Sequence, residues 1–216
     1  MSREAGYRTL VALTGILALL LVLQITGAFR GVNDSIGSAL PEGGSLTGTF
    51  TDTASFALTA VYILLFLLRD LKDRGRLSRF TLELTAGIAG SAVIVALLKV
   101  LTGVPRPGEA QVHWNLMESI KNVDYLAFPS GHTTRAAVLA YFLSRRWKAL
   151  WPLWWGWALG IGLSRLLLHA HWFSDVLFAL FLGPWTGLLV ELTENRWLPL
   201  YNAAVRKLKL GVFGVE

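Results

Sequence analysis

The stretch Thr9-Leu-Val-Ala-Leu-Thr-Gly-Ile-Leu-Ala-Leu-Leu-Leu-Val-Leu-Gln-Ile-Thr-Gly-Ala-Phe29 carries no charged side chain from its first residue to its last. A helix that crosses a bilayer needs about 20 consecutive, mostly apolar residues, so this segment predicts a membrane-spanning helix. Arg3 and Arg8 precede it, as basic residues precede the apolar core of a signal peptide. The apolar run is longer than such a core, which favours an uncleaved anchor.

The composition of the whole chain agrees with a membrane protein. Of the 216 residues, 54% are hydrophobic and 16% are charged, against about 25% charged residues in soluble domains. The sequence contains no cysteine, which excludes disulfides, thiolate metal sites and cysteine nucleophiles. The net charge of +6 is not taken as a sign of nucleic-acid binding, because in an apolar chain the position of the charges matters more than their sum. The length predicts one domain over residues 1–216.

Five further apolar stretches predict helices that join the first in an all-α, six-span transmembrane bundle: 53–68, 81–103, 131–145, 149–169 and 172–190. Most of the 20 Lys and Arg residues fall in segments on the side of the N-terminus in this arrangement. Because basic residues accumulate on the cytoplasmic side of a membrane, both termini are predicted to be cytoplasmic. The protein is expected to be a multi-pass protein of the cell membrane.

Three features of these segments have structural interpretations. A group of tryptophans at the inner ends of the fourth and fifth spans predicts an interfacial aromatic belt: Trp147, Trp151, Trp154 and Trp155. Two Gly-xxx-Gly pairs predict close helix packing: Gly156/Gly160 and Gly183/Gly187. Residues 191–216 form a basic tail, and the part from Tyr201 to Leu210 fits an amphipathic helix on the anionic inner leaflet.

Polar residues head the fourth predicted span, in the stretch Pro129-Ser130-Gly131-His132. Pro129 suits the first turn of a helix, and the backbone amides that follow are unpaired donors at the positive end of the helix dipole. Gly131 lets a ligand approach the backbone closely. The stretch predicts an anion site, and ordinary capping by Ser130 beside an unrelated His132 is the alternative.

A second polar cluster, Lys99-Val-Leu-Thr-Gly-Val-Pro-Arg-Pro107, closes the third predicted span. An unpaired charge inside an apolar run costs about 2.5–3.5 kcal/mol, so Lys99 needs a local reason. Snorkelling of its long stem is sufficient for Lys99 alone. It explains Arg106 less well, because Arg106 is held between two prolines. Two fixed cations at a short distance predict an anion that joins them.

The third cluster, Ser164-Arg-Leu-Leu-Leu-His-Ala-His-Trp-Phe-Ser-Asp175, connects the fifth and sixth spans. His171 and Asp175 are four residues apart and share a face if the first turn of the sixth helix includes both. A carboxylate on one imidazole nitrogen leaves the other as a nucleophile or base. Arg165 adds a planar cation that can grip two phosphate oxygens. A structural Arg–Asp or His–Asp pair between the two helices is the alternative.

The three clusters fall at the same, outer depth of the predicted bundle, although they come from distant parts of the chain. Cations at this depth can neutralise the equatorial oxygens of a phosphoryl group in transfer. One histidine can attack while the other protonates the departing oxygen. The sequence offers no acidic cluster for Mg²⁺, so the cations would replace a metal. We therefore expect metal-independent phosphoryl transfer without a cofactor at the outer membrane–water boundary.

These residues resemble the type 2 phosphatidic acid phosphatase (PAP2) superfamily of membrane lipid phosphatases, whose motifs are K-x6-R-P, P-S-G-H and S-R-x5-H-x3-D. In this chain the motifs fall within residues 99–175 and match at every position: Lys99 to Arg106-Pro107, Pro129 to His132, and Ser164-Arg165 to His171 and Asp175. The resemblance implies a six-span fold and hydrolysis of a lipid phosphate.

The resemblance also implies a role for each matched residue. His171 is the nucleophile that forms a phosphohistidine, Asp175 orients it, and His132 is the general acid. The phosphoryl oxygens are held by the remaining motif residues: Lys99, Arg106, Arg165, Ser130 and Gly131. Two histidines fall outside the motifs. His169 is expected to lie at the interface or behind the site, and His113 on the surface of a loop.

The continuation Thr133-Thr-Arg-Ala136 resembles the branch of the superfamily that acts on isoprenoid diphosphates. A second phosphate near Arg135 would supply the anion that an intramembrane arginine needs, and pairing with Asp124 or Asp175 explains Arg135 equally well. The expected function is hydrolysis of a polyprenyl or isoprenoid diphosphate at the extracytoplasmic side.

Two alternatives to this substrate and activity remain open. Phosphatidic acid or phosphatidylglycerophosphate is the alternative substrate. Binding or transport of a lipid phosphate without hydrolysis is the alternative of a different class. A transport path predicts charged residues distributed through the bilayer depth, whereas the midplane of every predicted span is apolar. The expected partners are the lipid substrate and the bilayer, with no nucleic acid, and the oligomeric state is left open.

Overall fold

The computed structural model describes residues 2–111 and 115–215. The described chain is helical, with the elements α1 (Arg3–Ile25), α2 (Arg30–Ala39), α3 (Ser45–Asp52), α4 (Phe56–Arg74), α5 (Arg79–Thr102), α6 (Leu116–Lys121), α7 (Gly131–Arg146), η1 (Lys148–Leu150), α8 (Trp151–Leu167), α9 (Phe173–Lys207) and η2 (Gly211–Phe213). Apart from an isolated bridge between Pro105 and Leu126, these residues form no β-structure.

Local sequence signals set the ends of the long helices. Ser55, Ser78 and Ser130 are the N-cap residues of α4, α5 and α7, and each hydroxyl accepts a backbone N–H three residues ahead, which satisfies a donor that the helix leaves unpaired. Gly75 and Gly103 end α4 and α5 in the left-handed conformation, with φ of +67° and +59°. Glycine adopts this conformation without steric cost, so it stops a helix cleanly.

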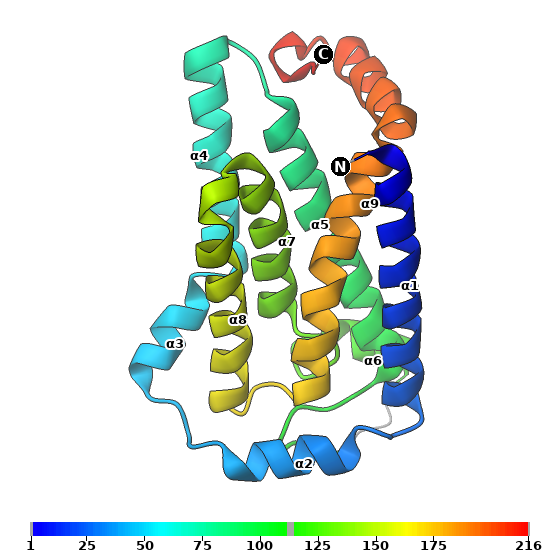
Figure 1. Ribbon diagram of the computed structural model, residues 1–216, viewed down its shortest axis with the longest axis vertical. Helices are drawn as coiled ribbons and strands as arrows, with labels where there is room; N and C mark the ends of the chain where they lie inside the picture. Colours follow the sequence, from blue (N-terminus) through cyan, green and yellow to red (C-terminus); the bar gives the residue numbers. More distant parts are fainter. Residues whose placement is uncertain (1, 112–114, 216) are drawn as a thin grey trace.

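The bundle is built around α7, which packs against α5, α8 and α9. Every residue of α7 from Thr133 to Ala140 is buried, so this helix forms the centre of the core. On the outside, α1 packs against α9 and α4 packs against α5. Figure 1 shows both chain termini at one end of the bundle and the short helices α2 and α6 at the other.

The six long helices α1, α4, α5, α7, α8 and α9 occupy the six stretches predicted from the sequence. Four segments of the described chain are long and apolar enough to cross a membrane: Arg3–Ile25, Ser45–Arg74, Arg79–Thr102 and Phe173–Lys207. The central helices α7 and α8 are shorter, with 16 and 17 residues. Of these two, α7 is the buried centre of the bundle, whereas α8 keeps one face exposed, with Leu153, Leu159 and Leu163 on it.

The last predicted span, 172–190, and most of the predicted basic tail, 191–216, form one continuous helix. Helix α9 continues to Lys207 through two internal prolines, Pro184 and Pro199. Its last turns and the segment after them form an apolar cluster with Leu77 and Leu82 at the start of α5, and Figure 1 shows them lying across that end of the bundle. Tertiary packing therefore accompanies the continuation of the helix past Pro199, although a proline inside a helix removes a backbone hydrogen bond.

The two glycine pairs have different environments. A Cβ built on Gly183 would approach the Ala137 carbonyl carbon to 2.7 Å, and Gly187 faces the ring of Tyr141. The prediction of close packing is thus confirmed for this pair, which lies against α7. In the other pair the prediction holds for Gly160, where a built Cβ would lie 3.1 Å from the Phe50 ring of α3, and is wrong for Gly156, where nothing lies within 4 Å.

The segment 30–52, in which the sequence gives no functional signal, forms α2 and α3 at the end opposite the termini (Figure 1). Asn33 of α2 is buried and hydrogen-bonded to Ser174 in the first turn of α9. The Gly43 N–H donates to the Leu167 carbonyl at 2.7 Å and so satisfies an acceptor at the end of α8. The loop thus braces the two helix ends that flank the third motif.

Candidate active site

Hydrogen bonds between the three motif regions bring them together at one end of the bundle. The Ala127 N–H donates to the Val104 carbonyl at 2.7 Å and joins the segment before the second motif to the first. The Trp172 indole N–H donates to the Pro105 carbonyl at 2.9 Å and joins the third motif to the first. The second and third motifs meet where the Ser130 N–H donates to the Asp175 carbonyl at 3.2 Å.

The His171–Asp175 pair lies at the start of α9. His171 Nδ1 is 3.3 Å from Asp175 Oδ2, and both residues are buried. The condition that both lie in the first turn of the helix is not met, because α9 begins at Phe173. They meet because Asp175 Oδ2 turns back to the helix start, where it also accepts the Trp172 N–H at 2.8 Å.

The position of His171, in the connection between α8 and α9, determines its protonation. Burial lowers the pKa of His171 well below its usual value of 6.5, and nearby cations, Arg165 foremost, lower it further. The neutral imidazole is therefore the resting form. With Nδ1–H directed to Asp175, Nε2 is left as the unprotonated, nucleophilic nitrogen.

The three motif cations come from separate elements of the fold. Lys99, in the last turns of α5, is buried and donates from Nζ to the Leu126 carbonyl and to the Val123 carbonyl, the latter at 3.3 Å. Arg106 follows α5, and Arg165 lies in the last turn of α8. The Nε atoms of both arginines are buried without a hydrogen-bond partner among the described residues. Such donors fit an anion that accepts from them.

The P-S-G-H stretch forms the N-terminus of α7. Ser130 is the N-cap: its hydroxyl lies 2.9 Å from Thr133 Oγ1 and accepts the Thr133 N–H at 3.4 Å, which agrees with the capping interpretation. The expectation that Pro129 lies in the first turn of the helix is wrong. The helix begins two residues later, at Gly131. Gly131 and His132 follow the cap and reach the cavity wall.

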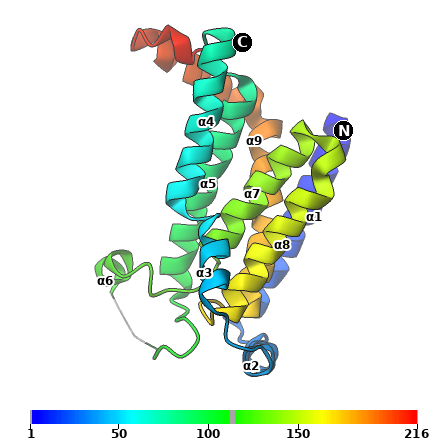
Figure 2. The ribbon, with the colours of Figure 1, turned by 90° about the vertical axis from the view of Figure 1, so that its left-hand side faces the viewer.

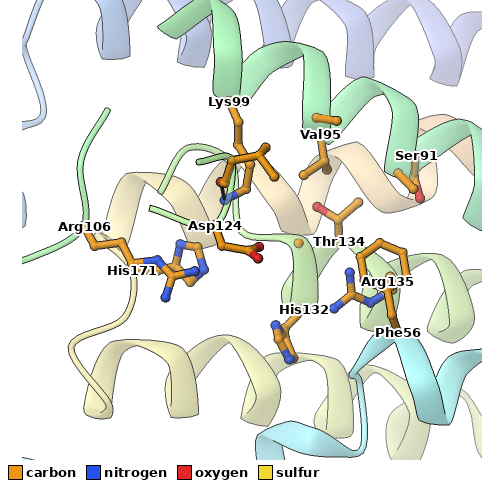
Figure 3. Close-up of a pocket in the computed structure, with 14 residues that line it drawn as sticks. Phe56, Ser91, Val95, Lys99, Arg106, Asp124, His132, Thr134, Arg135 and His171 are labelled. Atoms are coloured by element: carbon orange, nitrogen blue, oxygen red, sulfur yellow. Dashed lines mark hydrogen bonds between the residues drawn. The ribbon is translucent and has the colours of Figure 1, made fainter. Parts of the chain in front are cut away.

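A cavity of about 290 Å³ unites residues from all three motifs, and Figure 3 shows their side chains converging on it. The predicted site residues in its wall are Lys99, Arg106, Gly131, His132, Arg135 and His171. Arg165, Ser130 and Asp175 are buried behind this wall. The described residues contain no group of three or more His, Cys, Asp or Glu side chains placed to hold a metal ion.

Arg135, which the prediction paired with an anion or with a carboxylate, is held by other groups. Its Nε donates to the Ala54 carbonyl at 2.8 Å, and its guanidinium lies 3.9 Å from the centre of the Phe56 ring. Among the described residues, neither Asp124 nor Asp175 forms an ion pair with it. Arg135 remains in the cavity wall, beside Gly131, so part of its guanidinium faces the space where a ligand would lie.

Some residues near the site have no signal in the sequence. Asn33 lies far from the motif positions in the sequence, and only the fold brings it to α9. Asp124, five residues before Pro129 and considered as a partner of Arg135, instead lines the cavity. His169 is not in the wall of the main cavity and lines a small second cavity, which His171 and Trp172 also line. The expectation for His113 falls outside the described residues.

The fold and the site together define a class of protein: a helical membrane protein with a buried His–Asp pair and several cations around a cavity of suitable size for a phosphoryl group. The family model of the PAP2 superfamily matches residues 80–197, more than half of the 216 residues. The chain belongs to this superfamily. It is accordingly a hydrolase of phosphate esters, of the lipid phosphatase class, and a multi-pass membrane protein.

Two solved structures share the fold. The crystal structure of the first transmembrane PAP2-type phosphatidylglycerolphosphate phosphatase from Bacillus subtilis aligns with a TM-score of 0.69, at 22% identity, over 87% of this chain and 96% of that chain. The crystal structure of LpxE from Aquifex aeolicus aligns with a TM-score of 0.54, at 24% identity, over 75% of this chain and 93% of that chain.

Proposed function

We propose that this chain hydrolyses a lipid diphosphate, a polyprenyl or isoprenoid diphosphate, to the monophosphate through a phosphohistidine on His171. The observation that carries the proposal is the meeting of His171, His132 and the motif cations at one cavity, with His171 Nδ1 against the buried Asp175. Such a site can bind phosphoryl oxygens and present a neutral imidazole to the phosphorus.

The reaction proceeds in two steps. His171 Nε2 forms a bond to the terminal phosphorus while the bond from phosphorus to the bridging oxygen breaks, and His132 donates a proton to that oxygen. Water then loses a proton to His132 and attacks the phosphorus, the P–N bond breaks, and inorganic phosphate leaves. Asp175 stabilises the positive charge on His171 between the steps, and the cations offset charge on the equatorial oxygens. No metal is required for these steps.

Arg135 supports the choice of a diphosphate. It lies in the wall of the same cavity and has one nitrogen fixed by the Ala54 carbonyl, so the rest of its fork can bind a second phosphate. The alternative substrates are phosphatidic acid and phosphatidylglycerophosphate, each of which places a single terminal phosphate in the cavity.

The orientation in the membrane is part of the proposal. The site lies at the end of the bundle opposite the termini (Figure 1), and the distribution of Lys and Arg favours cytoplasmic termini. All six long helices would then span the bilayer, and the site would face the extracytoplasmic side. A polyprenyl diphosphate released on that side is a suitable substrate for such a site.

The test is phosphate release by the detergent-purified chain in the presence of EDTA. Farnesyl or undecaprenyl diphosphate, phosphatidic acid and phosphatidylglycerophosphate are offered in parallel to wild type, His171→Ala and the matched control His169→Ala. We expect release that survives EDTA, is fastest with the diphosphate, is lost in His171→Ala and is retained in His169→Ala. Retention in His171→Ala would exclude the phosphohistidine, and a folded wild type without activity on any lipid would indicate binding or transport instead.

A further inference from the structure

Two adjoining cavities lie between α4 and the helices α7 and α8, on the side of the bundle that carries both termini. The larger, of about 620 Å³, has a mainly apolar lining that includes Leu65, Leu143 and the tryptophans Trp147, Trp154 and Trp157. The charged lining of the smaller, of about 260 Å³, consists of four arginines and two aspartates: Arg69, Arg74, Arg79, Arg146, Asp70 and Asp73. Phe66, Arg69 and Trp147 line both, so an apolar space leads into a cationic one. We call the two together the α4 cleft.

The α4 cleft follows from the arrangement of the helices. Helix α4 packs mainly against α5, and Figure 2 shows α4 and α5 diverging from α7 and α8 toward the end with the termini. The aromatic rings of Phe66 and Trp147 lie 6.2 Å apart and those of Trp147 and Trp154 6.3 Å apart, forming one wall. The volume of the apolar part is within the range of about 300–1,000 Å³ that ligand pockets occupy. In a bilayer such a space is filled by hydrocarbon.

Most charges around the cationic part are already neutralised within the chain. Asp70 accepts the Ser78 N–H at 3.0 Å and the Thr81 hydroxyl at 2.6 Å, which fixes it to the start of α5. Arg69 forms an exposed pair with Asp73 at 3.4 Å, and such a pair contributes little.

Two of the four arginines form no ion pair among the described residues, and of these Arg74 acts on Asp70 only through its nearby charge. Arg79 is neutralised by Glu83, at 3.1 Å, and by Glu194. Among the described residues, neither Arg74 nor Arg146 forms an ion pair with a carboxylate; Arg146 lies 5.8 Å from the centre of the Trp147 ring. Guanidinium groups in such a position fit the geometry of a phosphate.

A further polar group supports a ligand in the apolar part. Trp154 lines that part, and its indole nitrogen is buried without a hydrogen-bond partner among the described residues. A buried indole N–H usually has an acceptor. Because this nitrogen is covered in the structure, an ester carbonyl beside an acyl chain would supply the acceptor after a small rotation of the Trp154 ring.

We propose that the α4 cleft binds one anionic diester phospholipid from the leaflet on the side of the termini, with an acyl chain between α4, α7 and α8 and the phosphate at Arg74 and Arg146. The lipid is a bound ligand and not a substrate, because no histidine lines either part among the described residues and the active site lies at the opposite end. If the termini are cytoplasmic, this leaflet is the anionic one, which favours such a ligand. By filling the gap beside α4, the lipid stabilises the folded bundle.

The test measures the binding of phosphatidylglycerol and phosphatidylcholine to the delipidated full chain in neutral detergent, by native mass spectrometry and by the lipid-dependent rise in Tm. Phosphatidylglycerol has a diester phosphate, so it is not consumed at the proposed active site. We expect it to bind at least tenfold more tightly than phosphatidylcholine, which equals about 1.4 kcal/mol. The double variant Arg74→Gln/Arg146→Gln should remove this preference. Leu65→Trp, from an exposed position that lines the cleft, should weaken both lipids.

The matched control is Arg206→Gln/Lys207→Gln, which removes the same charge from exposed residues of α9 outside the cleft. It should bind phosphatidylglycerol within twofold of wild type. Equal binding of the two lipids, or equal losses in the two double variants, would overturn the proposal in favour of general electrostatic attraction. Phosphate release by the same preparations reports on the proposed hydrolysis independently, because the lipid binding remains measurable whether or not the chain hydrolyses its substrate.

Discussion

Replacing Asn33 by alanine should slow the proposed reaction, although its hydrogen bonds among the described residues go to Ser174 and not to a matched motif position. Its Nδ2 donates to Ser174 Oγ at 3.0 Å and its Oδ1 accepts the Ser174 N–H at 3.1 Å. Ser174 is one residue before Asp175, in the turn that directs the carboxylate to His171. Asn33 therefore acts as a positioning residue, which fixes the start of α9 from a separate helix.

The expected magnitude follows from these two bonds. Each buried hydrogen bond contributes about 1 kcal/mol net, and a buried N–H left without an acceptor costs about 1–3 kcal/mol. Asn33→Ala should thus destabilise the chain by about 2–4 kcal/mol. A displacement of the reacting group by about 1 Å can cost on the order of 100-fold in rate. We expect kcat to fall about 10- to 100-fold and KM to change little, since the cations of the cavity are untouched.

Steady-state phosphate release and thermal unfolding test this expectation against a matched control. Asn202 likewise donates from Nδ2 and accepts at Oδ1, in its case both with the backbone of Val215, at 2.6 and 3.0 Å, at the opposite end of the bundle. Asn202→Ala should lower Tm and leave kcat unchanged. If both variants lose the same fraction of kcat, or if Asn33→Ala keeps full kcat while losing stability, the positioning role is refuted.

Three other predictions follow from the site and the packing. The acidic limb of kcat/KM should lie below pH 6.5, because a lowered pKa keeps His171 neutral and nucleophilic to more acidic pH; Arg165→Gln should move that limb to higher pH, and an unchanged limb would contradict the assignment. Gly183→Ala should lower stability by about 1–3 kcal/mol through overpacking against the α7 backbone, whereas Gly156→Ala, with open space around it, should be neutral or stabilising in thermal unfolding. Arg135→Gln should reduce kcat/KM at least tenfold more for a diphosphate than for a monophosphate, and equal losses would remove its role in binding a second phosphate.

The long helices could be predicted because their signals are local. The fourth predicted span, 131–145, differs by one residue from α7, whose start is set by the Ser130 cap. The short helices α2, α3 and α6 could not be predicted, because they are polar and lie in contact with other elements rather than in an apolar run. The continuation of α9 through Pro199 depends on packing against the start of α5, which no local pattern contains.

In the site, too, the residues with a local sequence signal could be predicted, and the contacts made by tertiary packing could not. The motif residues could be assembled from the sequence, since their types and spacing identify the phosphate chemistry and the six-span plan brings them to one depth. The partners that hold them could not. The Ala54 carbonyl and the Phe56 ring fix Arg135 from a different helix, and Asn33 reaches Ser174 across 141 positions of the chain.

His171 and Asp175 are four residues apart, and the sequence indicates that they meet because they share a face of one helix. The structure shows a different reason for their contact. Helix α9 starts after His171, so the imidazole belongs to the preceding connection and is free of helical geometry. Asp175 is the third residue of the helix, where a carboxylate naturally turns back to the backbone N–H at the helix start. The same Oδ2 atom accepts the Trp172 N–H and contacts His171 Nδ1. The bond that secures the helix start therefore also fixes the carboxylate that orients the proposed nucleophile.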